Sequence, residues 1–291
     1  MHIPVLAKEV LEYLSPKPGE NFVDCTLGNG GHAKLILEKT KPTGKLLGID
    51  YDQRQIDVSR DNLEGYKDRV ILENDSYANL EEIVKRNNFG KINGILLDIG
   101  MASYHPEESG RGFSFLRDEP LDMRYNTSNY GLTAYQIINT WPEEDIASIL
   151  KDYGEEKFSR RIASEIVRQR KIKKIETTAE LVKAIEKVIR GGKIHPATKT
   201  FQALRIAVNQ ELDNLEKVLP QVVNLLEKNG RLVVISFHSL EDRIVKNYFR
   251  KQKLENKVEI LTKKPVTASI AEVHENPKAR SAKLRAIIKT Y

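Results

Sequence analysis

The stretch of sequence that decides the fold reads NFVDCTLGNGGH, residues 21–32. An apolar run of strand type ends at Cys25 and leads into a glycine-rich turn, and helical periodicity begins directly after the turn. Glycines at such a turn let the backbone approach a ligand closely, and they leave the N–H groups of a helix N-terminus pointing at it. The stretch therefore predicts a strand, a turn and a helix with a ligand site at the turn.

Strand-type runs and helical segments alternate over the first hundred residues. Strands are expected at residues 21–25, 45–50, 69–73 and 94–99, with helices at 31–39, 53–63 and 78–88. Connections of this length require parallel strands joined by crossover helices. Further strand patterns at 231–237, 257–261 and 284–288 complete seven. The sequence predicts a doubly wound α/β sheet.

Between residue 100 and the strand at 231 the pattern becomes helical, after a loop at residues 110–115. Pro142, followed by two acids, starts one helix, and Thr177 with Glu180 fits the capping box of another, which Gly191-Gly192 ends. A long amphipathic helix is expected from Thr200 to about Lys228, ended by Asn229-Gly230. We predict an inserted helical domain at residues 116–196 and a sheet domain at 1–115 and 197–291.

Composition narrows the class of protein. No run of eighteen apolar residues occurs, and the first nine residues lack the basic-then-apolar layout of a signal peptide, so we expect a soluble, cytoplasmic protein with no membrane contact. The single Cys25 excludes an internal disulfide and a thiolate metal cluster, and the six histidines are scattered. No metal site is expected.

Basic residues gather in two windows although the net charge is only +6. Residues 160–174 hold seven basic residues, Arg168 and Lys171 among them, against one acid, and residues 278–289 hold five against none. Nucleic-acid binding depends on such local concentrations. The alternative is that both windows are solvated helix faces without a partner.

Asp50 ends the second expected strand, where a carboxylate can accept hydrogen bonds from two vicinal ribose hydroxyls. Gly28, Gly30 and Ala33 together with Asp50 also satisfy the dinucleotide fingerprint, so this motif alone does not choose between NAD and S-adenosylmethionine. Asp24 favours S-adenosylmethionine, because an acid before the glycines can meet the ammonium of that cofactor. No second nucleotide-binding half follows, and a nicotinamide dehydrogenase is the weaker alternative.

Eight separated motifs occur along the chain: HIPVL (2–6), TLGNGGH (26–32), RGFSF (111–115), PLDMR (120–124), HPAT (195–198), TFQALRIAVN (200–209), ISFHSLEDR (235–243) and RSAKLR (280–285). In these motifs and their order the chain resembles, over nearly its whole length, the bacterial ribosomal RNA small subunit methyltransferase H family, also called MraW. The resemblance implies a class I methyltransferase fold, Rossmann-like with a seven-stranded, mostly parallel sheet and an inserted all-helical domain for RNA recognition. It also implies S-adenosylmethionine-dependent methylation of the N4 amine of a cytidine in the decoding region of 16S rRNA, within the small ribosomal subunit.

Carried over residue by residue, the resemblance places the cofactor contacts on Gly30, Gly31, His32, Asp50, Tyr77, Asp98 and His105. Two of these positions depart from the family pattern. Tyr77 stands where the family commonly has Phe, which keeps a flat face for adenine. His105 stands where it commonly has Gln, and an imidazole offers its donor and acceptor in a different geometry.

Catalysis is expected to depend on Asp98, at the carboxyl end of the fourth strand, first as a cofactor contact and second as an acceptor for the cytidine amine. His238 is a second catalytic candidate, although a polar residue after a strand more often caps a loop. Substrate contacts are assigned to Arg168, Lys171, Arg205, Asn209 and Ser239. Phe201, Leu204 and Val208 are interpreted as the core face of their helix.

A second class of function stays open at this point, an S-adenosylmethionine-binding RNA or ribosome-assembly factor with little catalysis. The sequence does not determine the oligomeric state, and a homodimer is compatible with it.

Overall fold

A computed structural model describes residues 4–101, 104–128, 131–191 and 194–291. It divides into two compact units, residues 1–100 with 212–291, and residues 101–211. The second unit therefore includes residues 101–115 and 197–211, which the sequence analysis assigned to the sheet domain. Within the described residues no helix is long and apolar enough to cross a membrane.

In the described part of the first unit, seven strands form one sheet in the order β3-β2-β1-β4-β5-β7-β6. Strand β7 runs in the opposite direction to the other six described strands of this sheet. The bounds are β1 Phe22–Asp24, β2 Leu46–Asp50, β3 Val70–Asn74, β4 Ile92–Ile99, β5 Leu226–Ser236, β6 Val258–Ile260 and β7 Lys283–Lys289. The predicted seven-stranded, mostly parallel sheet is confirmed. The order departs from the 3-2-1-4-5-6 order of dinucleotide-binding domains after β5, because β7 lies between β5 and β6.

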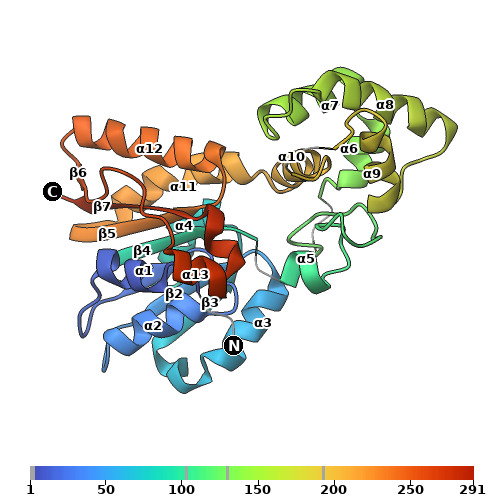
Figure 1. The fold of residues 1–291 in the computed structure, drawn as a ribbon. Helices are drawn as coiled ribbons and strands as arrows, with labels where there is room; N and C mark the ends of the chain where they lie inside the picture. Colours follow the sequence, from blue (N-terminus) through green and yellow to red (C-terminus); the bar gives the residue numbers. More distant parts are fainter. Residues whose placement is uncertain (1–3, 102–103, 129–130, 192–193) are drawn as a thin grey trace. The chain divides into compact units, whose positions relative to one another are not determined.

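Helices cover both faces of this sheet (Figure 1). One face packs against α1 Ala7–Leu14, α2 Gly31–Lys39 and α3 Gln53–Asn62, and the other against α4 Leu80–Arg86, α11 Glu211–Leu225 and α12 Ser239–Leu254. Successive strand residues point to opposite faces, so Leu96 joins the first core and Leu97 the second. Shorter elements are α13 Ile270–Glu275 and the 3₁₀ turns η1 Glu64–Arg69, η2 Tyr77–Asn79 and η3 Pro277–Ser281.

The described part of the second unit is helical, with α5 Tyr104–Glu108, α6 Ala134–Thr140, α7 Glu143–Asp152, α8 Ser159–Ile172, α9 Thr178–Glu186 and α10 Thr198–Asn209. Phe201, Leu204 and Val208 are buried in its core, which confirms their interpretation as a packing face. The capping box of Thr177 and Glu180 is present at the start of α9. That helix ends at Glu186, before Gly191, and Gly192 lies outside the described residues.

The long helix expected from Thr200 to Lys228 is wrong, because the chain breaks at Gln210, whose φ of 51° is left-handed. Tertiary contacts hold the break: Arg205 forms two hydrogen bonds with the Glu211 carboxylate, and Asn209 binds the backbone of Met123 and Tyr125. Helical periodicity continues through the break and cannot reveal it.

The expected end of that helix at Asn229-Gly230 is also wrong, because α11 stops at Leu225 and β5 begins at Leu226. Leu226 pairs with Ile92 of β4, and the register shifts before Gly94 pairs with Arg231. The Lys289 ammonium donates hydrogen bonds to the carbonyls of Asn224 and Leu226 and so binds the end of the helix.

Candidate functional site

The candidate site lies at the carboxyl ends of the central strands. Strand β1 lies between β2 and β4, so the strand order reverses there, and in open α/β sheets ligands bind outside the carboxyl ends at such a point. Asp24 is the last residue of β1, Asp50 is the last of β2, and Asp98 is the last but one of β4. Three carboxyl groups therefore end neighbouring strands at this edge of the sheet.

The glycine turn is fixed by Asp50. One Asp50 carboxylate oxygen accepts a hydrogen bond from the Gly28 N–H at 2.8 Å, and the other accepts one from the Asp52 N–H at 2.9 Å. Gly28 and Gly30, with φ values of 52° and 79°, adopt the left-handed conformation that side chains disfavour, and Gly30 is the N-cap of α2. A carboxylate has about four lone-pair positions, so Asp50 keeps capacity for ribose hydroxyls.

Behind the turn, Asp24, His32 and Asp98 form a buried polar cluster. His32 Nε2 lies 3.6 Å from Asp98 Oδ2. Among the described residues, Asp24 Oδ2, Asp98 Oδ1 and both His32 ring nitrogens are buried and have no hydrogen-bond partner. Buried polar atoms are almost always hydrogen-bonded in native proteins, so this cluster, with its carboxylate acceptors and an imidazole that carries at least one N–H, is suited to a polar ligand. The ammonium of S-adenosylmethionine, with three N–H donors, fits it.

Thr26 connects the ends of β1 and β4. Its hydroxyl oxygen accepts a hydrogen bond from the Asp98 N–H at 2.6 Å, and its own N–H donates to Asp24 Oδ1 at 3.2 Å. Thr26 cannot be identified as a site residue from the sequence, because a threonine after a strand carries no signal until the neighbouring strand is known.

Burial raises the pKa of Asp24 to about 7. His32 and the hydrogen bond from Thr26 lower this pKa, whereas Asp98 and Asp50 add to the increase. Burial therefore favours the protonated form of Asp24 in the cofactor-free protein, and a bound cation favours its ionised form.

We expect the free energy of unfolding of the cofactor-free protein to fall between about pH 4 and pH 7, because folded Asp24 must keep a proton that unfolded Asp24 has released. Asp24→Asn, which resembles the protonated acid, should remove this pH dependence and be the more stable protein at pH 8 by a few kcal/mol. Urea unfolding at pH 5 and pH 8 measures the difference. The exposed Asp57→Asn is the control, and identical pH profiles for parent and Asp24→Asn contradict the expectation.

Other predicted cofactor residues are placed differently. Tyr77 lies in η2, directly after β3, and packs half-buried against the core. A Cβ on Gly31 would come within 2.7 Å of the Pro4 ring, so the close approach of Pro4 leaves no room for a side chain at position 31. His105 belongs to α5 of the second unit, where it is buried with its ring 5.0 Å from that of Phe113.

His238 is the N-cap of α12, and Ser239 is the first residue of that helix. His238 Nδ1 accepts a hydrogen bond from the Glu241 N–H at 3.4 Å, while the Glu241 carboxylate accepts from the His238 N–H at 3.2 Å. This reciprocal pair is a capping box. The arrangement favours the loop-capping alternative for His238 over a catalytic role.

Arg205 and Asn209, predicted to bind substrate, hold the second unit together. The Arg205 guanidinium donates to both Glu211 oxygens, at 2.8 and 2.9 Å. Asn209 accepts from the Tyr125 N–H at 2.8 Å and donates to the Met123 carbonyl at 2.7 Å. These contacts give both residues a structural role that the amphipathic pattern could not show.

The two basic windows differ in the structure. In α8, Arg168 and Lys171 are exposed, and Arg168 forms a bidentate pair with Glu165 that lowers the pKa of this acid to about 2. In the window at 278–289, by contrast, Arg285 is buried against Asp242 and Lys289 is buried against carbonyl groups. Arg285 and Lys289 therefore serve internal contacts, and the local concentration of basic residues in this window overstates what it can offer to a nucleic acid.

Known proteins resemble the chain over its full length. A relative from Sulfurihydrogenibium sp., named Ribosomal RNA small subunit methyltransferase H, is 50% identical over 98% of this chain and 97% of its own. One of the same name from Dictyoglomus thermophilum is 46% identical over 98% of this chain and 95% of its own.

A solved structure from Clostridium thermocellum, assigned as an rRNA-methylase, covers 99% of this chain and 100% of its own with a TM-score of 0.50. At 13% identity it shows a similarity of fold alone. The sequence model of the MraW methylase family matches residues 1–290 of this chain. With this match and relatives so similar over almost their whole length, the chain belongs to the MraW methylase family.

Proposed function

We propose that this chain transfers a methyl group from S-adenosylmethionine to the exocyclic N4 amine of a cytidine in the decoding region of 16S rRNA. Its family membership establishes that the chain is an S-adenosylmethionine-dependent rRNA methyltransferase. The choice of cytidine N4, and of the small subunit as the form in which the RNA is presented, rests on the resemblance described above and on the chemistry of Asp98.

The observation that carries the proposal is the buried Asp98 Oδ1, which has no hydrogen-bond partner within the described residues. It lies at the carboxyl end of β4, beside the glycine turn. An exocyclic amine offers N–H donors that satisfy such an acceptor, and an acceptor on the N–H makes the nitrogen lone pair more available. A ring carbon would offer no such donor.

Bound S-adenosylmethionine supplies an electrophilic methyl group on its sulfonium. Asp50 and the glycine turn would hold the ribose, and Asp24 would hold the ammonium, which leaves Asp98 Oδ1 for the cytidine amine. Fixing both ends aligns the methyl group for in-line attack, and such positioning supplies much of the acceleration in bimolecular reactions. Asp98 Oδ1 would take the proton that the amine loses as its nitrogen gains the methyl group, while the S–CH3 bond breaks and the sulfonium leaves as a neutral thioether.

The test is product analysis. We expect the purified protein, given S-adenosylmethionine and small subunits that lack the modification, to produce N4-methylcytidine in 16S rRNA, as measured by mass spectrometry of the nucleosides. Methyl transfer to another atom contradicts the N4 assignment. Binding of both ligands without any product would instead support the assembly-factor alternative.

We propose that the helical unit contributes RNA contacts through α8. Arg168→Glu with Lys171→Glu should weaken RNA association at least tenfold and make its salt dependence shallower by about 1.4, for two lost phosphate contacts on single-stranded RNA. The cofactor affinity should not change. Lys151→Glu with Lys183→Glu makes the same charge change elsewhere in this unit and serves as the control. Equal salt slopes for the α8 variant and the parent would mean that α8 is a solvated face.

A further inference from the structure

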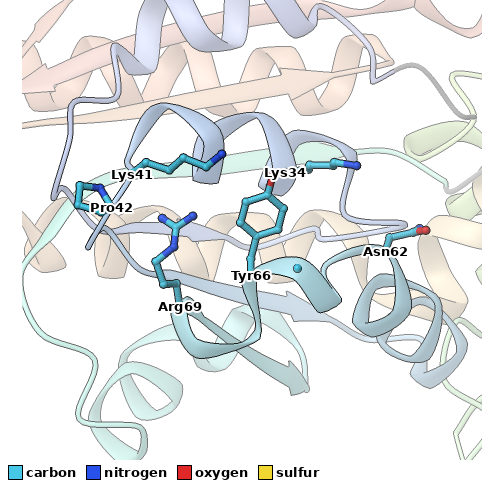
Figure 2. A pocket seen from close by; sticks show the side chains of 7 residues that line it. Lys34, Lys41, Pro42, Asn62, Tyr66 and Arg69 are labelled. Atoms are coloured by element: carbon cyan, nitrogen blue, oxygen red, sulfur yellow. The ribbon is translucent and has the colours of Figure 1, made fainter.

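The sheet unit contains a basic pocket of about 500 Å³ that the proposed chemistry does not use. Figure 2 shows Lys41 and Pro42 at one end, Asn62 at the other, and Tyr66 with Arg69 between them. Lys34 of α2 completes the polar lining, and none of the lining residues is acidic. A volume of this size lies within the range of small-ligand pockets.

Arg69 is held rigidly at the base of this pocket. Its guanidinium donates to the carbonyl of Gly44 at 2.9 Å and to that of Leu37 at 3.1 Å, and it lies 5.4 Å from the centre of the Tyr66 ring. Two of its five N–H donors are used in these contacts. A fixed guanidinium with donors to spare binds phosphate at little cost in conformational entropy.

The two lysines differ in their partners. Lys41 pairs with Glu38 at 2.6 Å, with its ammonium 5.9 Å from the centre of the Tyr66 ring. The Lys34 ammonium forms no ion pair or hydrogen bond with the described residues, and it is exposed. Lys34 is therefore available to an incoming anion without breaking an existing contact.

The pocket is linked to the glycine turn. Asn62 of its lining donates a hydrogen bond to the Asn29 carbonyl at 3.0 Å, and Asn29 lies between Gly28 and Gly30. Lys34 belongs to the first turns of α2, the helix that begins at the same glycines. The Asn62 end of the pocket is therefore next to the turn, whereas Arg69, which directly precedes β3, lies toward the amino ends of the strands.

We infer that the pocket binds a phosphodiester of the RNA substrate, at a nucleotide other than the reacting one, with Tyr66 as a stacking face for its base. Lysine and arginine neutralise RNA phosphates, and aromatic rings between basic groups are the usual support for single-stranded bases. The inference rests on the proposed function for the identity of the RNA. It assigns to the sheet unit an RNA subsite separate from the methyl-transfer site.

The test compares two variants that each lose two positive charges. Lys34→Gln with Lys41→Gln alters the pocket, and Lys251→Gln with Lys253→Gln alters exposed positions at the end of α12, a helix that packs against β6 at the opposite edge of the sheet. Binding of 16S rRNA is measured by fluorescence anisotropy over a series of KCl concentrations. We expect the pocket variant to bind about tenfold more weakly at 150 mM KCl, with a salt slope shallower by about 1.4. The control should resemble the parent, and all should bind S-adenosylmethionine equally.

Tyr66→Leu tests the stacking face separately. It should weaken RNA binding about fivefold or more without a change in salt slope, because stacking involves no counterion release. Parent-like binding by this variant and by the lysine variant overturns the inference, even if the parent makes N4-methylcytidine. Conversely, a shallower slope for the lysine variant supports the pocket even if no N4-methylcytidine forms.

A free inorganic anion is the alternative ligand for the same basic pocket. Inorganic phosphate carries the same negative charge and acceptor oxygens, so the thermal midpoints of parent and lysine variant are measured with and without it. Stabilisation by phosphate that is lost in the lysine variant, together with unchanged RNA binding, would assign the pocket to a free anion and overturn the inference for RNA.

Discussion

Replacing Asp98 by Asn is expected to lower the turnover of methyl transfer about 100-fold, the lower end of what a positioned acid–base group contributes. The substitution keeps the shape of the side chain but removes its charge. Asp98 Oδ1 is buried without a partner among the described residues. The amide oxygen of Asn can still accept a hydrogen bond there, but it cannot take up the proton that the amine loses. The affinity for S-adenosylmethionine should change much less. Single-turnover kinetics and calorimetry separate the two quantities.

His238→Ala is the matched comparison for Asp98→Asn. Since His238 caps α12, its loss should lower the free energy of unfolding by about 1 kcal/mol, and turnover per folded molecule should be nearly unchanged. If Asp98→Asn lowers affinity and turnover in equal proportion, Asp98 binds the cofactor only. The acceptor would then have to be sought at residues 238–239 or at a backbone carbonyl.

The second large effect is expected for Asp50→Ala, which should weaken S-adenosylmethionine binding by about 1.5–3 kcal/mol, or roughly ten- to a hundredfold. Two losses combine in this variant. The ribose loses its acceptor, and the Gly28 N–H loses the carboxylate that fixes the turn. Isothermal titration calorimetry measures the affinity, with Asp57→Ala on the exposed face of α3 as the control. An unchanged affinity would remove Asp50 from the site.

Much of the sheet could be predicted from the sequence because its signals are local. The helix predicted at 31–39 coincides with α2, and its start is set by glycines that adopt left-handed conformations. The strands are short apolar runs between turns, and burial on both faces makes them visible. The break at Gln210 could not be predicted, because it depends on Asn209 reaching a segment more than eighty positions earlier in the chain.

Some residues of the candidate site and of the basic pocket could likewise be predicted from the sequence, and others could not. Glycines and acids at strand ends are recognisable wherever they occur, so Gly30 and Asp50 could be placed from the sequence. Thr26 and Arg69 could not, since Thr26 acts on a residue of β4 and Arg69 acts on carbonyls of the α2 region. His238 is a catalytic candidate from the sequence but caps α12 in the structure. A polar residue after a strand gives the same sequence pattern whether it takes part in catalysis or caps a helix.

The pairing of β4 with β5 has a consequence for the order in which the chain folds. Strand β4 precedes the helical unit and β5 follows it, so β4 is an open edge of the nascent sheet until residues 226–236 have been synthesised. The helical unit is continuous in sequence and its contacts are local, which favours rapid folding. During synthesis it can therefore form first, while the half-built sheet, with its apolar β4 edge unprotected, is the part of the molecule that depends on protection from aggregation.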